Sequence, residues 1–235
     1  MAYEIISKIE KIFGVETVND ANYIKALTHP SYINNGEVGY NDCYERLEFL
    51  GDAVLKLAVS NILYEKYPNY NEGQMSKIRS IVVSDSILAK ISNRIGLSEL
   101  IIAGEHDIKQ GIRKLESVNA CAFEAILGAY FLDGKFYKIS AVLAEWLKEY
   151  IVEVDNNFEK YNAKAILQEY TQSLTKETPK YDIVSSSGKE HNKIFVAEVS
   201  YRGEVIAKGE GKTKKDAEQN AAYDACIKLG AVNHE

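Results

Sequence analysis

The sequence lacks any long hydrophobic run. No apolar stretch reaches the roughly 18 residues that a membrane-spanning helix needs, although 46% of the 235 residues are hydrophobic and 26% are charged. The first 14 residues also lack the basic start and uniform apolar core of a signal peptide, because Glu4, Lys8 and Glu10 alternate with isoleucines. We therefore expect a globular cytoplasmic protein that begins with an amphipathic helix and has no membrane contact.

Cysteine is scarce and basic charge is not in excess. The three cysteines, Cys43, Cys121 and Cys226, are odd in number and far apart, so they form no zinc-binding pattern and predict reduced thiols. The net charge is -6, which argues weakly against a nucleic-acid partner. Residues 1–160 hold 17 basic and 23 acidic residues, whereas residues 161–235 hold 11 of each. Phosphate binding would therefore depend on local basic patches, and the acidic first part would suit divalent cations.

The first part of the chain predicts helices. Apolar residues from Leu47 to Ile62 recur in steps of three and four, which indicates a helix over 44–67 that ends in a turn at Pro68 and Gly73. Further helices are predicted over 75–95, with Gly96 as its stop, and over 116–132 and 139–154. The polar stretch 104–111 is predicted to be a loop.

The pattern changes after residue 155. The polar segment 155–160 is typical of a linker, and a helix over 163–174 follows it. Strands are predicted over 180–185, 193–201 and 204–210, with a hairpin turn at Arg202–Gly203. A last helix is predicted over 214–229, with Thr213 as its N-cap. This α-β-β-β-α order predicts a small sheet with two helices on one face.

Three carboxylates in the first part share one face of a helix. Glu45, Glu48 and Asp52 stand at positions i, i+3 and i+7, so they repel one another unless cations neutralise them. Oxygen ligands of this kind suit Mg²⁺. The spacing alone leaves a second interpretation open, in which these residues form a solvated acidic surface.

The residues around this stripe resemble a known family. The segment Glu45-Arg46-Leu47-Glu48-Phe49-Leu50-Gly51-Asp52-Ala53-Val54-Leu55 resembles the signature of the ribonuclease III family almost letter for letter. Residues 26–32, 71–76 and 123–129 resemble its other motifs in the same order. The resemblance covers essentially the whole chain. It implies an all-α catalytic and dimerisation domain over 1–155, a linker over 156–161 and an α+β double-stranded-RNA-binding domain over 162–231.

The resemblance implies an endoribonuclease that cuts double-stranded RNA. It implies that Glu48, Asp52 and Glu124 hold Mg²⁺, for which Mn²⁺ can substitute, and that this ion activates the attacking water. Glu45 and Glu72 would line the RNA-binding face and help to place a phosphate or a second metal. It also implies a homodimer that leaves 5′-phosphates, 3′-hydroxyls and two-nucleotide 3′ overhangs, in the processing of rRNA and mRNA. Phe49 stands where the family has an aromatic residue that enters a socket on the partner subunit, and its alternative is an ordinary core residue.

Cys121 departs from the family pattern. It stands where the family has a metal-binding Asp, one helical turn before Glu124, and a thiol matches Mg²⁺ poorly. Three interpretations are open: an enzyme with weaker metal affinity, a binding protein with little cleavage, or a small buried residue.

The tail carries a second resemblance. The segment Gly209 to Ala222 resembles the closing motif of double-stranded-RNA-binding domains, and Lys212, Lys214 and Lys215 lie around the predicted start of its helix. The resemblance places Gln168, Glu169 and Gln172 on one RNA minor groove and His191, in the loop 186–192, on another. Glu218 stands where many such domains have a third basic residue.

Three functions remain as hypotheses. The first is the homodimeric enzyme, and the second is a duplex-RNA-binding dimer that has lost cleavage through Cys121. The third is an unrelated metal-dependent phosphohydrolase that shares an acidic helix, against which the tail domain argues.

Overall fold

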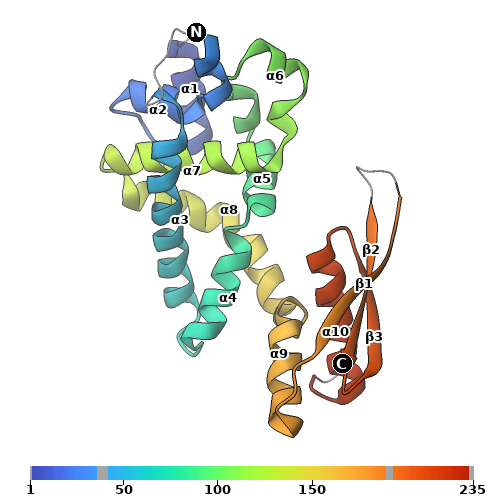
Figure 1. The fold of residues 1–235 in the computed structure, drawn as a ribbon. Coiled ribbons are helices and arrows are strands. Elements are labelled where there is room, and N and C mark those ends of the chain that lie inside the picture. Colours follow the sequence, from blue (N-terminus) through green and yellow to red (C-terminus); the bar gives the residue numbers. More distant parts are fainter. Residues whose placement is uncertain (1, 36–41, 189–192, 233–235) are drawn as a thin grey trace. The chain divides into compact units, whose positions relative to one another are not determined.

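The described residues of the first part of the chain form a set of helices (Figure 1). The computed structural model describes residues 2–35, 42–188 and 193–232, and its contacts divide the chain into two units, 1–153 and 154–235. The helices of the first part are α1 (Ala2–Phe13), α2 (Asp20–Leu27), η1 (Pro30–Asn35), α3 (Glu45–Lys66), α4 (Glu72–Val82), α5 (Asp85–Arg94), η3 (Leu97–Leu100), α6 (Glu105–Lys109), η4 (Ile112–Lys114), α7 (Glu116–Leu132) and α8 (Phe136–Asn156).

Helix α7 forms the centre of this unit. Its residues from Val118 to Tyr130 are almost all buried, because α7 packs against α2, α3 and α5 (Figure 1). A helix that is apolar around most of its circumference is stable only when other helices cover it on several sides. Aromatic rings extend the core beyond these neighbours. The ring of Phe13 on α1 lies 5.1 Å from that of Trp146 on α8 and 6.5 Å from that of Phe123 on α7.

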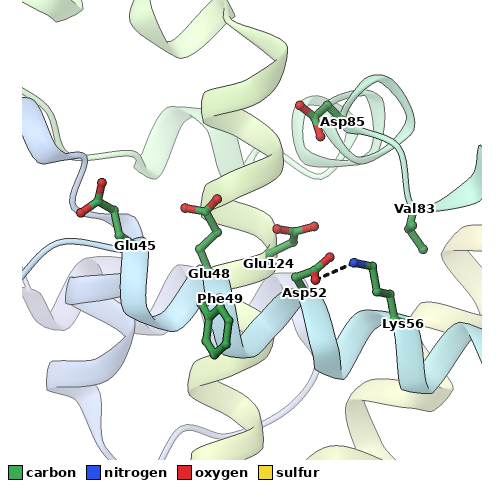
Figure 2. Close-up of a pocket in the computed structure, with 8 residues that line it drawn as sticks. All are labelled: Glu45, Glu48, Phe49, Asp52, Lys56, Val83, Asp85 and Glu124. Atoms are coloured by element: carbon green, nitrogen blue, oxygen red, sulfur yellow. Dashed lines mark hydrogen bonds and ion pairs between the residues drawn. The ribbon is translucent and has the colours of Figure 1, made fainter. Parts of the chain in front are cut away.

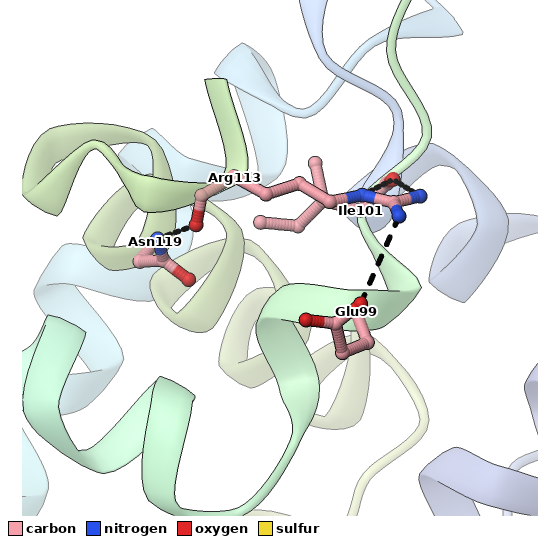
Figure 3. A network of polar contacts seen from close by, with 4 residues as sticks. All are labelled: Glu99, Ile101, Arg113 and Asn119. Carbon is pink, nitrogen blue, oxygen red and sulfur yellow. Dashed lines mark hydrogen bonds and ion pairs between the residues drawn. The ribbon is translucent and has the colours of Figure 1, made fainter. Parts of the chain in front are cut away.

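A polar network holds the start of α7 in place (Figure 3). The Arg113 guanidinium donates from Nε and Nη2 to the carbonyl oxygen of Ile101, at 3.0 and 2.7 Å. The fully buried Asn119 side chain donates to the carbonyl of Arg113 at 2.7 Å and accepts from the Ser92 hydroxyl at 3.1 Å. Buried amides are costly when unpaired. The network therefore sets the turn from which α7, with Cys121 and Glu124, begins.

The structure corrects three local predictions. The helix expected over 75–95 is two helices, α4 and α5, separated at Val83 and Ser84. Gly73 lies inside α4 and not in the preceding turn, because Asn71 caps α4 by accepting from the backbone N–H of Gln74. The expected loop 104–111 contains the short helix α6. Gly96 does follow the end of α5, with a left-handed φ of 76°.

The second unit is an antiparallel sheet with helices packed on it. Its elements are α9 (Phe158–Thr175), β1 (Lys180–Ser187), β2 (Ile194–Tyr201), β3 (Glu204–Gly211) and α10 (Lys214–Leu229), and the strand order is β1-β2-β3. Helix α10 packs on β2, β3 and α9. The core contains Ala197 and Val199 of β2. The predicted combination of an all-α part and an α-β-β-β-α part is confirmed.

Turn and cap residues hold these elements as predicted. Arg202 and Gly203 both have positive φ, 56° and 81°, as a tight hairpin between β2 and β3 requires. The Thr213 side chain accepts from the backbone N–H of Asp216 and so caps α10. The close contact between β3 and α10 also depends on a glycine, since a Cβ on Gly209 would lie 2.1 Å from the backbone nitrogen of Ala221.

The segment expected as a linker is almost entirely helical. Asn156 ends α8 and α9 begins at Phe158, so that only Asn157 lies outside a helix between them. Polar composition therefore did not predict irregular backbone here. The domain limits 1–155 and 162–231 remain predictions. None of the described helices combines the length and apolarity needed to cross a membrane.

Candidate active site and nucleic-acid interface

The acidic stripe of α3 faces helix α7. Glu45, Glu48 and Asp52 follow one another at steps of three and four, which on a helix places them on the same side. Figure 2 shows these three carboxylates along α3, with Glu124 reaching the same space from α7. Side chains from two separate helices therefore converge, as the sequence predicted for Glu48, Asp52 and Glu124.

Two glycines allow this convergence. A Cβ on Gly51 of α3 would lie 1.7 Å from the carbonyl oxygen of Glu124, and a Cβ on Gly128 of α7 would lie 2.4 Å from the carbonyl oxygen of Leu47. Real Cβ atoms never approach backbone this closely, so the helices can cross at this distance only with glycine at both positions. The crossing brings the backbone of Glu124 against α3 between Glu48 and Asp52.

The carboxylates line an open pocket of about 620 Å³. Its lining residues are Glu45, Glu48, Phe49, Asp52, Lys56, Val83, Asp85 and Glu124. Asp85, Lys56 and Val83 were not assigned to the site from the sequence. Asp85 is the first residue of α5, and the break between α4 and α5 is what brings it to the pocket rim (Figure 2).

The pocket holds more negative than positive charge. Burial, together with the charges of Asp52, Glu48 and Asp85, raises the pKa of Glu124 to about 8, while Lys56 acts in the opposite direction. A carboxyl group with this pKa is largely protonated at neutral pH unless a cation enters. Lys56 forms an ion pair with Asp52, with Nζ 2.7 Å from Oδ2.

The chemistry of the donors fits a hard divalent cation. Glu48, Asp52 and Glu124 offer carboxylate oxygens to one solvent-open pocket, where the repulsion between them adds to burial in raising the pKa of Glu124. Within the described residues, no three His, Cys, Asp or Glu side chains are already arranged around a single ion position. Binding would therefore require rotation of these side chains about their χ angles.

Cys121 lies within this acidic centre. Its thiol donates to Oε1 of Glu48 over 3.2 Å and is partly exposed. Burial, and then the hydrogen bond to Glu48, raise the pKa of Cys121 to about 12. The group is therefore a neutral thiol at physiological pH in the metal-free protein. Of the three interpretations, a purely buried residue is wrong, because Cys121 is only partly buried and contacts a candidate ligand.

Glu72 and Phe49 occupy different surroundings. Glu72 is exposed at the start of α4, accepts a hydrogen bond from Ser76 and lines a second pocket between α3 and α4, so within one chain it does not join the acidic pocket. Phe49 is 83% exposed, so the alternative that it is a core residue is wrong. An aromatic side chain this exposed is a candidate for contact with another molecule.

The second unit presents the polar groups expected to meet RNA. Lys212, Lys214 and Lys215 are exposed at the start of α10, and Gln168, Glu169 and Gln172 are exposed on α9. Glu218 pairs with Lys164 across the two helices at 2.6 Å, so its charge is partly neutralised. The prediction for His191 lies outside the described residues.

Comparisons with known proteins agree with this architecture. Residues 19–151 match the family model described as ribonuclease-III-like, and residues 163–229 match the double-stranded RNA binding motif. A protein named ribonuclease 3 from Fusobacterium nucleatum subsp. nucleatum is 39% identical over 221 residues, which are 92% of this chain and 93% of that protein. Ribonuclease 3 of Staphylococcus aureus strain JH9 is 38% identical over 236 residues, 97% of each chain. The nuclease domain of ribonuclease III from Campylobacter jejuni superposes with a TM-score of 0.56 at 32% identity, over 62% of this chain and 97% of that domain.

A helical domain with an acidic pocket, followed by a double-stranded-RNA-binding domain, defines a hydrolase that acts on duplex RNA. The chain belongs to the ribonuclease III family and is a ribonuclease. The family generally depends on a divalent metal.

Proposed function

We propose that this protein is a homodimeric, Mg²⁺-dependent endonuclease that cuts both strands of duplex RNA. The observation that carries the proposal is that carboxylates from α3 and α7 line one open pocket whose negative charge is incompletely balanced. Such a set of oxygen donors suits Mg²⁺, with Mn²⁺ as a substitute. When bound, an ion of this kind polarises a phosphate and activates a water molecule.

The residues of the chain have separate roles in this proposal. Glu48, Asp52 and Glu124 would hold the ion, and Asp52 and Glu124 would also accept hydrogen bonds from the attacking water and so orient it. Glu45 lies at the outer end of the pocket, where it keeps the RNA backbone in register. The water would add to phosphorus as the bond to the 3′ oxygen breaks, with one proton of the water passing to solvent and the 3′ oxygen taking up a proton from solvent. The products are a 5′-phosphate and a 3′-hydroxyl.

The dimer and the staggered cut are part of the same proposal. Exposed Phe49 supports a contact with a second copy, since it lines a pocket together with Leu47, Leu50 and Leu132, whose other lining residues include Lys25, Glu45 and Arg46. The Campylobacter jejuni nuclease domain is described with a region involved in dimer formation. Two copies would place two acidic pockets on one duplex and cut opposite strands two nucleotides apart. Glu72, which does not reach its own chain's acidic pocket, would then line the RNA-binding face.

The proposed cellular role depends on where duplex RNA occurs. Duplex segments occur within folded ribosomal and messenger precursors, and we propose that the protein processes both in the cytoplasm. The double-stranded-RNA-binding unit would read duplex shape and 2′-hydroxyls through α9 and the start of α10.

A second function is favoured by one observation. Cys121 stands where the family has a metal-binding Asp, and its thiol donates a hydrogen bond to Glu48. The acidic centre therefore has one negative charge less than in the family pattern. A protein in which this change abolished metal binding would remain a duplex-RNA-binding dimer without cleavage.

A cleavage assay distinguishes these functions. Labelled duplex RNA is incubated with the wild-type protein and with Glu124→Gln, in Mg²⁺, in Mn²⁺ and in EDTA. The enzyme predicts short products with two-nucleotide 3′ overhangs from the wild type alone, and only when metal is present. A mobility shift of intact RNA by both proteins in every condition would support the binding protein.

A further inference from the structure

One residue that lines the acidic pocket is a lysine. Lys56 lines the pocket one helical turn after Asp52, and it is the only basic residue among the residues that line this pocket in the described chain. Figure 2 shows its ammonium group directed back toward the Asp52 carboxylate, on the side of Val83 and Asp85. The Nζ–Oδ2 distance is 2.7 Å. The ion pair therefore occupies an oxygen that the proposed function assigns to the divalent metal.

This ion pair is easily exchanged. The two side chains are 51% and 39% exposed, and an exposed pair at i, i+4 contributes little because water screens it. A divalent cation carries twice the charge of an ammonium and binds carboxylate oxygens without the entropy loss of ordering a long side chain. The metal would displace the ammonium from Asp52 without disturbing the fold of α3.

The displaced ammonium stays close to the pocket. The side chain of Lys56 is anchored on α3 and is flexible beyond its Cβ, so release from Asp52 leaves a free cation at the pocket rim. A cation placed there repels a bound divalent ion and attracts an anionic phosphate. The same side chain would therefore weaken metal binding and strengthen the binding of RNA.

We propose that Lys56 is an internal counter-cation that competes with the divalent metal for Asp52 and, once displaced by it, contacts an RNA phosphate. The proposal rests on the proposed function, because it requires a metal at Asp52. It assigns Lys56 as a positioning residue whose partner changes from a carboxylate to a phosphate when metal binds. It predicts that the RNA contact of Lys56 exists only in the presence of a divalent ion.

The metal half of the proposal is tested without RNA. Free Mn²⁺ is measured by electron paramagnetic resonance during titration of the wild-type protein, Lys56→Gln and Lys56→Arg. The same titration of Glu124→Gln identifies the relevant Mn²⁺ site as the site that this variant has lost. Lys56→Gln is expected to bind Mn²⁺ roughly three- to tenfold more tightly, because the competing charge is gone. Lys56→Arg keeps that charge and is expected to bind like the wild type. Lys11→Gln, which removes an exposed lysine of α1 that does not line the pocket, is the matched control.

The RNA half is tested by the salt dependence of binding. Fluorescence anisotropy of a labelled duplex is measured over a salt series in Ca²⁺ and in EDTA, with a denaturing gel to verify that the RNA stays intact. In Ca²⁺, the slope of log affinity against log salt is expected to fall by about one per chain in Lys56→Gln, as for one lost phosphate contact. In EDTA, where the ammonium is held by Asp52, the slope should equal that of the wild type.

The possible failures are distinguishable. If the wild-type protein and Glu124→Gln bound Mn²⁺ equally, the proposed metal centre itself would be overturned. Equal Mn²⁺ affinities of wild type and Lys56→Gln would overturn the competition alone. A slope that changes equally in Ca²⁺ and EDTA would show a phosphate contact independent of metal and would overturn the exchange of partners.

Discussion

At the scale of single residues, we propose that Cys121 determines how strongly the acidic centre binds a hard cation. Its thiol points at Glu48 where a carboxylate would add both charge and an oxygen donor. We predict that Cys121→Asp raises the affinity for Mg²⁺ by roughly 10–100-fold, the range typical for restoring or removing a ligand or its supporting partner. The measurement is the cleavage rate of duplex RNA across a Mg²⁺ titration.

Cys121→Ser is the matched control, since it keeps the size and the hydrogen bond but adds no charge. It is expected to follow the wild type. Cleavage curves that coincide for wild type and Cys121→Asp would mean that this position does not face the metal.

Glu124 links the stability of the metal-free protein to pH. Its pKa is about 8 in the folded chain against 4.5 as a free side chain, so folding favours the protonated form. The stabilising contribution is full below about pH 4.5 and is lost as the pH rises through 8. We predict that the melting temperature in EDTA falls more between pH 6 and about pH 8.5 for the wild type than for Glu124→Gln, whose side chain cannot ionise.

Differential scanning fluorimetry in matched buffers measures this difference. Other groups titrate in both proteins and cancel in the comparison. Identical pH profiles of the two proteins would show that Glu124 is not buried among other carboxylates.

At the scale of elements, the crossing of α3 and α7 depends on Gly51. Alanine at this position would bring a Cβ to 1.7 Å from the backbone of Glu124, so the helices must separate. Replacing glycine by alanine inside a helix normally gains up to about 1 kcal/mol. Here we predict a net loss of roughly 1–3 kcal/mol, the usual range for overpacking, together with weaker metal binding.

Urea unfolding followed by Trp146 fluorescence measures the loss. Trp146 is the only tryptophan and packs against Phe13 in the first unit, so it reports on that unit. Gly73→Ala is the control, because a Cβ there meets only the side-chain oxygen of Asn71, at 3.4 Å. A destabilisation of Gly51→Ala no larger than that of Gly73→Ala would contradict the close crossing.

Long periodic elements were predictable, and their interruptions were not. The steps of three and four along α3 and the uninterrupted run of α7 indicated both helices with nearly correct ends. The separation of α4 from α5 occurs at Val83 and Ser84, where neither glycine nor proline marks a break. Ser84 and Asp85 are common at helix starts, but inside a continuous helical pattern that signal is weak. The polar residues around Asn157 favoured a linker, although polar side chains are equally at home on an exposed helix.

The same distinction holds for the candidate site. The motif residues Glu45, Glu48, Asp52 and Glu124 were identified because they stand in an ordered, recognisable pattern, and the structure brings them into one pocket. Asp85 was missed because its approach depends on the break before α5. Lys56 was not assigned to the site from the sequence. The role of Gly51 in the close crossing of α3 and α7 was also missed, because it depends on a tertiary contact that a single sequence does not reveal.

At the scale of the whole molecule, the acidic and basic residues proposed to act in function lie in different parts of the chain. Residues 161–235 carry no net charge, yet Lys214 and Lys215 concentrate positive charge at the start of α10. We predict that Lys214→Gln with Lys215→Gln weakens duplex binding and lowers its salt slope by about two, one for each phosphate contact. Cleavage at saturating RNA should change little, because the acidic pocket is untouched.

A matched double variant controls for net charge. Lys180 and Lys208 lie on the sheet face that alternates with the partly buried Tyr181 and the buried Ala207, away from the packed helices, and Lys208 forms an ion pair with Glu198. Lys180→Gln with Lys208→Gln removes the same charge and is expected to keep the wild-type slope. Equal effects of the two double variants on binding would indicate a diffuse field and not a defined contact.

The glycine contact between α3 and α7 has a consequence for engineering. Because the helices meet backbone to backbone at Gly51 and Gly128, we expect the spacing of positions 48, 52, 121 and 124 to depend little on which side chains they carry. Donor atoms at these positions can then be exchanged one at a time, oxygen for sulfur or imidazole nitrogen, on an unchanged scaffold. The preference of the centre among hard and soft ions becomes a property that can be retuned without redesigning the fold.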